Sequence, residues 1–143
     1  MRKYIILIFF IPLISLVSCE QESPEQYWQK GNLHTHSFWS DGDDFPEMII
    51  QWYKDNNYQF IALSDHNTIA SRDYWYKLKT LDEQNKTLEK YQKSFGDWVE
   101  TKIDSSGTYV RLKTFEEYKS KLEHPKPFLI IRSEEVTSSF ENK

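Results

Sequence analysis

The side chains best suited to chemistry in this sequence are imidazoles and carboxylates that fall in three short segments. They are His34, His36, Asp41, His66 and Glu135. Nitrogen and oxygen ligands without a thiolate suit zinc, manganese or iron. The sequence therefore predicts a site for such divalent ions, provided that the fold brings the three segments together.

The secondary structure expected around these residues places them at one edge of a sheet. Residues 30–36 and 58–63 have the pattern of strands, and residues 46–57 between them have helical spacing with Pro46 at the first position. Parallel strands joined through a helix end on the same side of the sheet, so their following loops meet. On an extended strand, alternate residues such as His34 and His36 project from one face, with their Cα atoms roughly 6 to 7 Å apart. One metal ion can therefore reach both imidazoles.

The remainder of the chain predicts further elements. Residues 71–92 have broadly helical spacing, and residues 95–112 contain a turn signal of a hairpin at 105–107. A strand is expected at 128–131, and if it is parallel to the others, the carboxylate that follows it joins the site. His124 is interpreted as an ordinary loop residue.

A helix is also expected from Thr114 to about Leu122. Thr114 and Glu117 have the spacing of a capping box, in which each side chain accepts a hydrogen bond from the other residue's backbone N–H. The prolines that follow His124 break this helix before the last strand begins.

The residues around the predicted ligands resemble the motifs of PHP domains, the family of DNA polymerase and histidinol phosphatase domains. Residues 32–36 (NLHTH) and 40–42 (SDG) resemble the first motif, residues 62–68 (ALSDHNT) the second, and residues 135–137 (EVT) the third. The likeness is good over about residues 30–70 and moderate over residues 127–137.

The resemblance implies roles for individual residues. His34, His36 and Glu135 would bind one metal ion in a cluster of two or three, while Asp41 and His66 would serve a neighbouring ion. Asp65 would orient an imidazole, and with His66 it would form the catalytic pair. Glu134 is the alternative carboxylate ligand, because one sequence does not exclude a shift by one residue.

The resemblance also implies a fold, which is an α/β architecture in the form of a distorted (βα)7 TIM-like barrel of the PHP type. Further ligands in that family come from later strands, whereas no histidine follows His124 here and six residues follow Thr137. We therefore expect residues 30–143 to be the N-terminal portion of such a domain, a partial barrel with its first strands only. Residues 71–113 match no part of the family and are interpreted as an insertion.

The first 29 residues have the pattern of an exported lipoprotein. Residues 1–18 combine a cationic start with an apolar run that is too short for the ~20 residues of a membrane-spanning helix. The four residues ending at Cys19 resemble the bacterial lipobox, and residues 19–29 suit a tether. We expect Cys19 to carry a lipid that anchors the protein to a membrane, in the periplasm or at the cell surface. The alternative is an ordinary signal peptide followed by a free cysteine.

These observations together favour a metal-dependent phosphoesterase, similar to histidinol phosphatases, that acts outside the cytoplasm on a small-molecule phosphoester. The formal net charge of −4 gives no basic surplus, so nucleic acid is not an expected partner. Two alternatives stay open. One is a non-catalytic surface lipoprotein whose five Trp, nine Tyr and nine Phe residues bind carbohydrate or peptide, and the other is an inactive truncated PHP fragment.

We predict that bacterial expression in the presence of labelled palmitate marks the wild-type protein and leaves the Cys19→Ala variant unlabelled, because only the thiol of Cys19 can accept the lipid. The measurement is the label recovered with the purified protein. Equal labelling of both proteins would exclude lipidation at Cys19.

Overall fold

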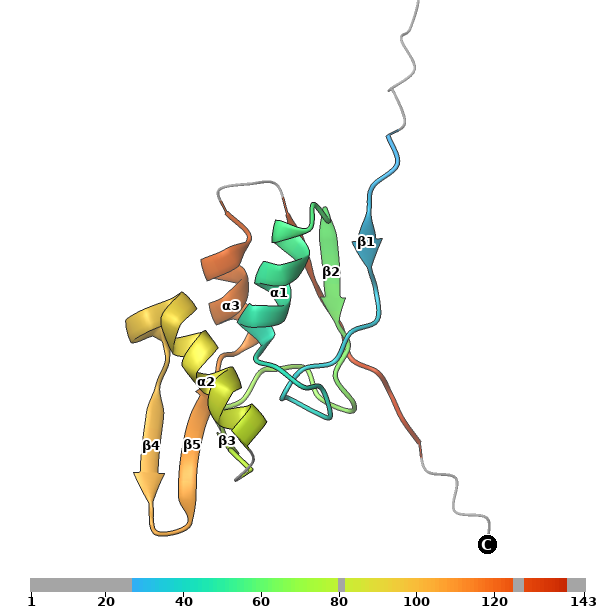
Figure 1. The fold of residues 1–143 in the computed structure, drawn as a ribbon. Helices are drawn as coiled ribbons and strands as arrows, with labels where there is room; N and C mark the ends of the chain where they lie inside the picture. Colours follow the sequence, from blue (N-terminus) through green and yellow to red (C-terminus); the bar gives the residue numbers. More distant parts are fainter. Residues whose placement is uncertain (1–26, 80–81, 125–127, 139–143) are drawn as a thin grey trace, which may run out of the picture.

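A computed structural model describes residues 27–79, 82–124 and 128–138, so the expected signal peptide and Cys19 lie outside the described residues. The strands that lead to the predicted ligands form a parallel sheet (Figure 1). It consists of β1 (Gly31–Asn32), β2 (Phe60–Leu63) and β6 (Leu129–Arg132), in the order β1-β2-β6. Both neighbours of β2 run parallel to it, which confirms the expectation that all three strands end at one edge.

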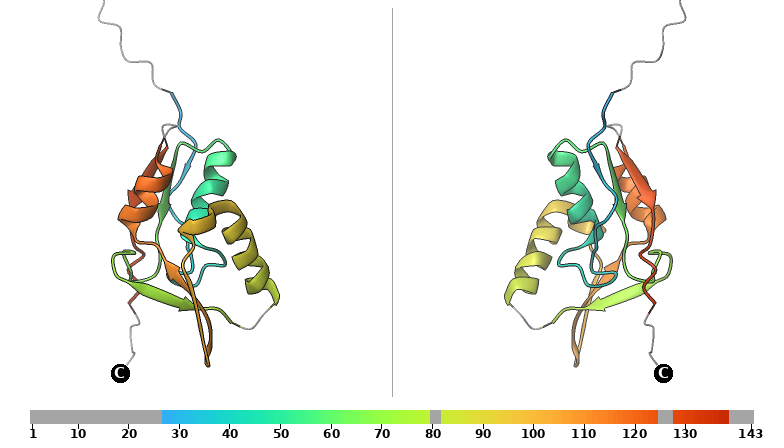
Figure 2. Two further views of the ribbon diagram at one scale, coloured as in Figure 1. Left: turned by 90° about the vertical axis from the view of Figure 1, so that its left-hand side faces the viewer. Right: turned by 90° about the vertical axis from the view of Figure 1, so that its right-hand side faces the viewer.

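Two helices cover one face of this sheet (Figures 1 and 2). Helix α1 (Pro46–Asp55) connects β1 to β2 and begins with proline at its first position, as the sequence predicts. Helix α3 (Phe115–Leu122) precedes β6. The capping box at its start is confirmed, because the Glu117 backbone N–H donates to Thr114 Oγ1 and the Thr114 N–H donates to Glu117 Oε2 at 2.8 Å.

The segment between β2 and α3 forms a second sheet, which is antiparallel. It contains β3 (Tyr74–Lys77), β4 (Thr101–Asp104) and β5 (Gly107–Leu112), in the order β3-β5-β4. The expected hairpin is confirmed by the pairing of β4 with β5. Helix α2 (Asp82–Phe95) and a short 3-10 helix η1 (Gly96–Trp98) lie between β3 and β4. We refer to residues 74–112 as the antiparallel unit.

Two expectations for local structure are wrong. The helix expected from residue 71 is interrupted because Tyr74 to Lys77 form β3, where aromatic side chains fit the pleated surface and Tyr74 pairs with Leu112. Strand β1 is shorter than expected because Asn32 Oδ1 accepts a hydrogen bond from the His34 N–H at 2.9 Å. That local bond competes with the ladder to β2.

The expected partial (βα)7 barrel is also wrong. The described residues form two separate three-stranded sheets instead of one curved parallel sheet. Strand β2 already has a neighbour on each side, and the chain that follows it pairs with itself in the antiparallel unit before β6 returns to β2. The protein is therefore a small mixed α/β structure.

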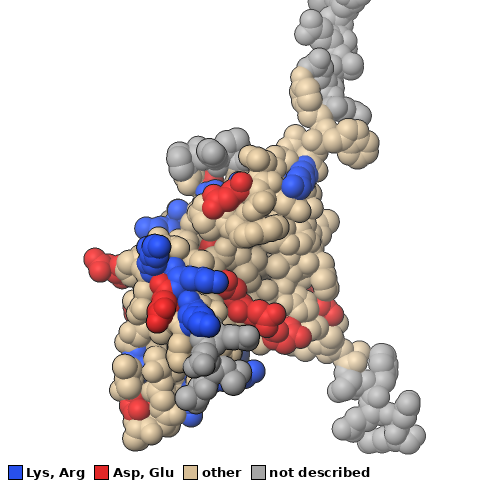
Figure 3. All heavy atoms as spheres, in the orientation of Figure 1, with Lys and Arg blue, Asp and Glu red and all other residues tan. Residues whose placement is uncertain are grey.

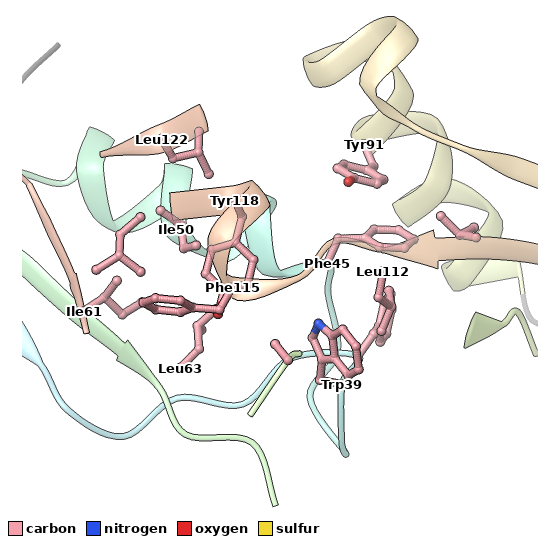
Figure 4. Packing of buried hydrophobic residues seen from close by; sticks show 14 of the residues in the cluster. Trp39, Phe45, Ile50, Ile61, Leu63, Tyr91, Leu112, Phe115, Tyr118 and Leu122 are labelled. Carbon is pink, nitrogen blue, oxygen red and sulfur yellow. The ribbon is translucent and has the colours of Figure 1, made fainter. Parts of the chain in front are cut away.

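One hydrophobic core joins the two sheets (Figure 4). Phe45, just before α1, stacks on Tyr91 of α2 with ring centroids 4.2 Å apart and an angle of 16° between the planes. Many of the aromatic side chains serve this core. They include Phe38, Trp39, Phe45, Tyr91, Phe115, Tyr118 and Phe128. None of the helices in the described part of the chain is both long and apolar enough to cross a membrane.

A carboxylate is buried among these aromatic side chains. Glu47 of α1 is fully buried, and its Oε1 accepts a hydrogen bond from Trp98 Nε1 at 3.1 Å. Burial raises the pKa of Glu47 to about 7 from an ordinary value of 4.5, although the hydrogen bond from Trp98 acts in the opposite direction. The folded chain therefore retains a proton on Glu47 at pH values where the unfolded chain releases it.

We predict that the free energy of unfolding falls as the pH rises from about 4.5 to 7, with Glu47 contributing about 3 kcal/mol to the change. Glu47→Gln should remove this part of the pH dependence and stabilise the protein at pH 8. Urea unfolding followed by circular dichroism at pH 4.5 and pH 8 measures both effects. The control is Glu89→Gln, at an exposed position of α2. A wild-type pH dependence in the Glu47→Gln variant would contradict the prediction.

Candidate metal centre

A tight loop after β1 presents His36 and Asp41 at the carboxyl edge of the parallel sheet. The backbone N–H groups of Ser40 and Gly42 both donate to the Ser37 carbonyl oxygen at 3.0 Å. A Cβ atom on Gly42 would lie 2.4 Å from the carbonyl carbon of His36. Only glycine lets the chain fold back this closely, so Gly42 fixes Asp41 relative to His36.

The buried carboxylate of Asp65 holds this loop against the end of β2. Asp65 Oδ1 accepts hydrogen bonds from the Ser37 N–H at 2.7 Å and from Ser40 Oγ at 2.6 Å, while Oδ2 accepts from Ser37 Oγ at 2.8 Å. The expectation that Asp65 orients an imidazole is therefore corrected, since its hydrogen-bond partners in the described chain are Ser37 and Ser40. A carboxylate that is 3% exposed requires such donors. In turn it positions the loop after β1 that carries His36 and Asp41, which we call the ligand loop.

Glu135 reaches the same edge because the chain continues parallel to β2 beyond β6. A parallel bridge pairs His66 with Glu135, the Glu135 N–H donates to the Asp65 carbonyl oxygen at 3.1 Å, and the Asn67 N–H donates to the Glu135 carbonyl oxygen at 2.9 Å. Asn67 has a positive φ of 50°, and its side chain exchanges two hydrogen bonds with Thr137. These contacts hold the backbone on both sides of the Glu135 side chain.

The Glu135 carboxylate faces both histidines of the first motif. Its Oε2 lies 3.5 Å from His34 Nε2 and 2.9 Å from His36 Nε2. The two imidazole centroids are 4.9 Å apart. The structure thus places Glu135 against the histidines, whereas its neighbour Glu134 is exposed. His34, His36 and Glu135 form one group whose ligand atoms lie within 4.8 Å of one another.

A second group of possible ligands shares His36 and adds Asp41 and His66. Asp41 Oδ1 lies 2.8 Å from His36 Nδ1, and Asp41 Oδ2 lies 3.4 Å from His66 Nε2. The other nitrogen of His66, Nδ1, is buried without a hydrogen-bond partner among the described residues, 3.6 Å from Glu135 Oε2. His66 therefore lies between the two carboxylates.

These distances fit metal binding. Two ligands at about 2.1 Å from a tetrahedral ion lie about 3.4 Å apart, which matches the separations of His34 from Glu135 and of His66 from Asp41. A neutral imidazole has one lone pair for a metal. When His36 carries its hydrogen on Nδ1, it donates that hydrogen to Asp41 and offers Nε2 as a ligand, an arrangement common in metal sites. Asp41 then keeps Oδ2 for a second ion.

The electrostatics of the site link metal binding to proton release. Partial burial lowers the pKa of His36, but its hydrogen bonds with Asp41 and Glu135 outweigh this effect and raise the pKa above 6.5. The hydrogen bond with His36 is the main cause of a lowered pKa at Asp41. Because a metal requires the unprotonated imidazole nitrogen, an ion must displace a proton that these carboxylates favour.

Comparisons of this chain with models of protein families, with curated proteins and with solved structures give no match. The likeness to PHP domains thus depends on the motif residues alone and stays a prediction. The structure does bring together all five ligands expected from the sequence. The roles of Ser37 and Ser40 as donors to Asp65 were missed, because nothing in their spacing distinguishes them from ordinary serines in a loop.

We predict that replacing His34 and His36 together by alanine lowers the amount of zinc or manganese that co-purifies with the protein, with a loss of at least ~10-fold in affinity. Elemental analysis and a metal titration measure the two quantities. His124→Ala is the matched control, because His124 is an exposed histidine outside the site. An unchanged metal content in the double variant would show that the site is assigned wrongly.

Proposed function

We propose that this protein is a metal-dependent phosphoesterase that hydrolyses a small-molecule phosphoester. The observation that supports the proposal best is the convergence of three imidazoles and two carboxylates from three chain segments, with the buried His66 Nδ1 left without a hydrogen-bond partner among the described residues. A structural cluster would normally satisfy such a nitrogen. An ion bound to Nδ1 would satisfy this nitrogen, whereas an ion bound to Nε2 beside Asp41 would leave Nδ1 as a donor that faces Glu135.

The ligand arrangement suits hydrolysis of a phosphoester. Divalent ions bound at such a site supply the Lewis acidity that lowers the pKa of a water molecule and neutralises charge on the phosphoryl oxygens. Glu135 is within 3.6 Å of all three imidazoles, so its carboxylate has a central place in the cluster. Asp41 lies on the other side of His66 from Glu135, and its side chain is largely exposed. This side of the cluster is therefore open to a substrate.

The remaining residues position the ligands. In this proposal Asp65 does not touch the substrate, and it acts by fixing the loop that carries His36 and Asp41 through Ser37 and Ser40. His66 is the residue best placed to contact the reacting groups, since its two nitrogens face Asp41 and Glu135. Holding such groups in a fixed geometry contributes strongly to catalysis.

We also propose that the protein is exported from the cytoplasm and is attached to a membrane by a lipid anchor. This part of the proposal is supported by the lipobox-like sequence that ends at Cys19. An exported enzyme meets phosphoesters that come from the environment or the cell surface. Such a location favours release of phosphate from a small molecule over a step in cytoplasmic biosynthesis.

We predict that the purified protein hydrolyses p-nitrophenyl phosphate when manganese or zinc is added and that a chelator abolishes this activity. Glu135→Gln should lower kcat/KM about 100-fold, because it removes the carboxylate shared by the imidazoles. Glu134→Gln, which changes an exposed neighbour in the same way, should stay within about twofold of the wild type.

The proposal is wrong if the metal-loaded protein releases no phosphate from any of a panel of phosphomonoesters and phosphodiesters. Equal losses in the Glu135→Gln and Glu134→Gln variants would instead show that the activity does not depend on the site described above. Circular dichroism of both variants verifies that they are folded.

A further inference from the structure

A polar cavity of about 590 Å³ opens beside Asp41. One wall is the ligand loop, which contributes Asp41 and Asp43. The opposite wall comes from the antiparallel unit, which contributes Tyr76, Lys79 and Gln84. This volume is in the range of ordinary small-molecule sites. The proposed metal centre thus has an adjoining space large enough for the organic part of a substrate.

The far wall is held in place by contacts within the antiparallel unit. Gln84 Nε2 donates to the Tyr76 hydroxyl oxygen at 3.2 Å, and Gln84 Oε1 accepts from the Lys79 backbone N–H. The Tyr76 ring stacks on Phe38 of the ligand loop, with centroids 4.6 Å apart and planes within 9°. Because Tyr76 accepts from Gln84, its hydroxyl hydrogen is left to be donated to a ligand.

The charges around the cavity are divided between its walls. Asp41 and Asp43 lie on one side, and the cationic residue Lys79 lines the other. Figure 3 shows acidic side chains in the middle of this face of the molecule, beside Lys and Arg side chains that lie over α2. A ligand in the cavity therefore meets hydrogen-bond acceptors on one wall and donors on the other.

A second hollow, lined in part by His36, has a different character. It measures about 280 Å³, and its lining includes the side chains of Ile49, Trp52 and Tyr53 from α1. An apolar leaving group would fit that hollow, whereas in the polar cavity it would leave donors and acceptors without partners, which is costly. The two spaces therefore predict different substrates.

We propose that the polar cavity binds the sugar portion of a sugar phosphate whose phosphoryl group lies at the metal centre. This inference rests on the proposed function and names its class of substrate. Sugar hydroxyls both donate and accept hydrogen bonds, so they can donate to Asp43 and accept from Tyr76 and Lys79. The half-buried ring of Tyr76, which stacks on Phe38 behind it, adds an apolar surface of the kind that packs against sugar C–H groups.

The test is calorimetric titration of the zinc-loaded protein with phosphonates, which are not hydrolysed. Phosphonate analogues of glucose 6-phosphate and ribose 5-phosphate are compared with benzylphosphonate. We expect at least one sugar phosphonate to bind about tenfold more tightly than benzylphosphonate. Tyr76→Phe, which keeps the ring and removes the hydroxyl, should weaken sugar phosphonate binding about fivefold and leave benzylphosphonate within twofold.

Charge is tested separately with Lys79→Met, which should weaken binding of the sugar phosphonates. Lys93→Met, which removes an exposed lysine of α2 that does not line the cavity, should leave it unchanged. Elemental analysis of each variant verifies that the metal content is that of the wild type. Weaker binding of benzylphosphonate in Trp52→Ala, together with no preference for sugars, would assign the substrate to the apolar hollow and overturn the proposal.

The outcomes separate this inference from the proposed function. Hydrolysis of p-nitrophenyl phosphate without any preference for sugar phosphonates, or without an effect of Tyr76→Phe, would overturn the sugar site and leave the phosphoesterase intact. Sugar phosphonate binding that depends on Tyr76 and Lys79, in a protein that hydrolyses no phosphoester, would support the sugar site and refute the enzymatic proposal.

Discussion

The candidate metal centre depends on one buried carboxylate, that of Asp65. Three short hydrogen bonds from Ser37 and Ser40 satisfy this carboxylate and hold the loop after β1 against the end of β2. A charge buried to this extent is tolerated only when such donors surround it, so the loop and the carboxylate stabilise each other. The positions of His36 and Asp41 follow from that contact, because both residues belong to the loop that Asp65 holds.

The two sheets contribute different parts of the candidate site. The parallel sheet brings the ligands together, since β1, β2 and β6 end at one edge and each is followed by part of the site. The antiparallel unit contributes none of the five ligands, but it forms the far wall of the polar cavity. The stack of Phe45 on Tyr91 joins the two units inside one core. In the proposed function, metal binding and substrate recognition thus belong to different parts of the chain.

The sequence predicted which side chains converge better than it predicted the fold. Local patterns were sufficient for the parallel strands, for α1 and for the capping box of Thr114 and Glu117, because each depends on residues close together in the chain. The barrel was wrongly expected because motifs around His34 and His66 report on strand ends and not on how the intervening chain pairs. The serine donors to Asp65 could not be predicted either, since a buried carboxylate selects its donors only in the folded state.

The contact between His36 and Glu135 joins residues that are 99 positions apart in the sequence. Closing a flexible loop costs entropy that grows only with the logarithm of its length, by about 0.6 kcal/mol for each doubling. A longer or shorter connection from β2 to β6 therefore changes the entropy cost of bringing the ligands together only slightly, as long as its core contacts, such as that of Tyr91 with Phe45, are kept. A chain built in this way can alter the walls of its cavity while its cluster of imidazoles and carboxylates stays the same.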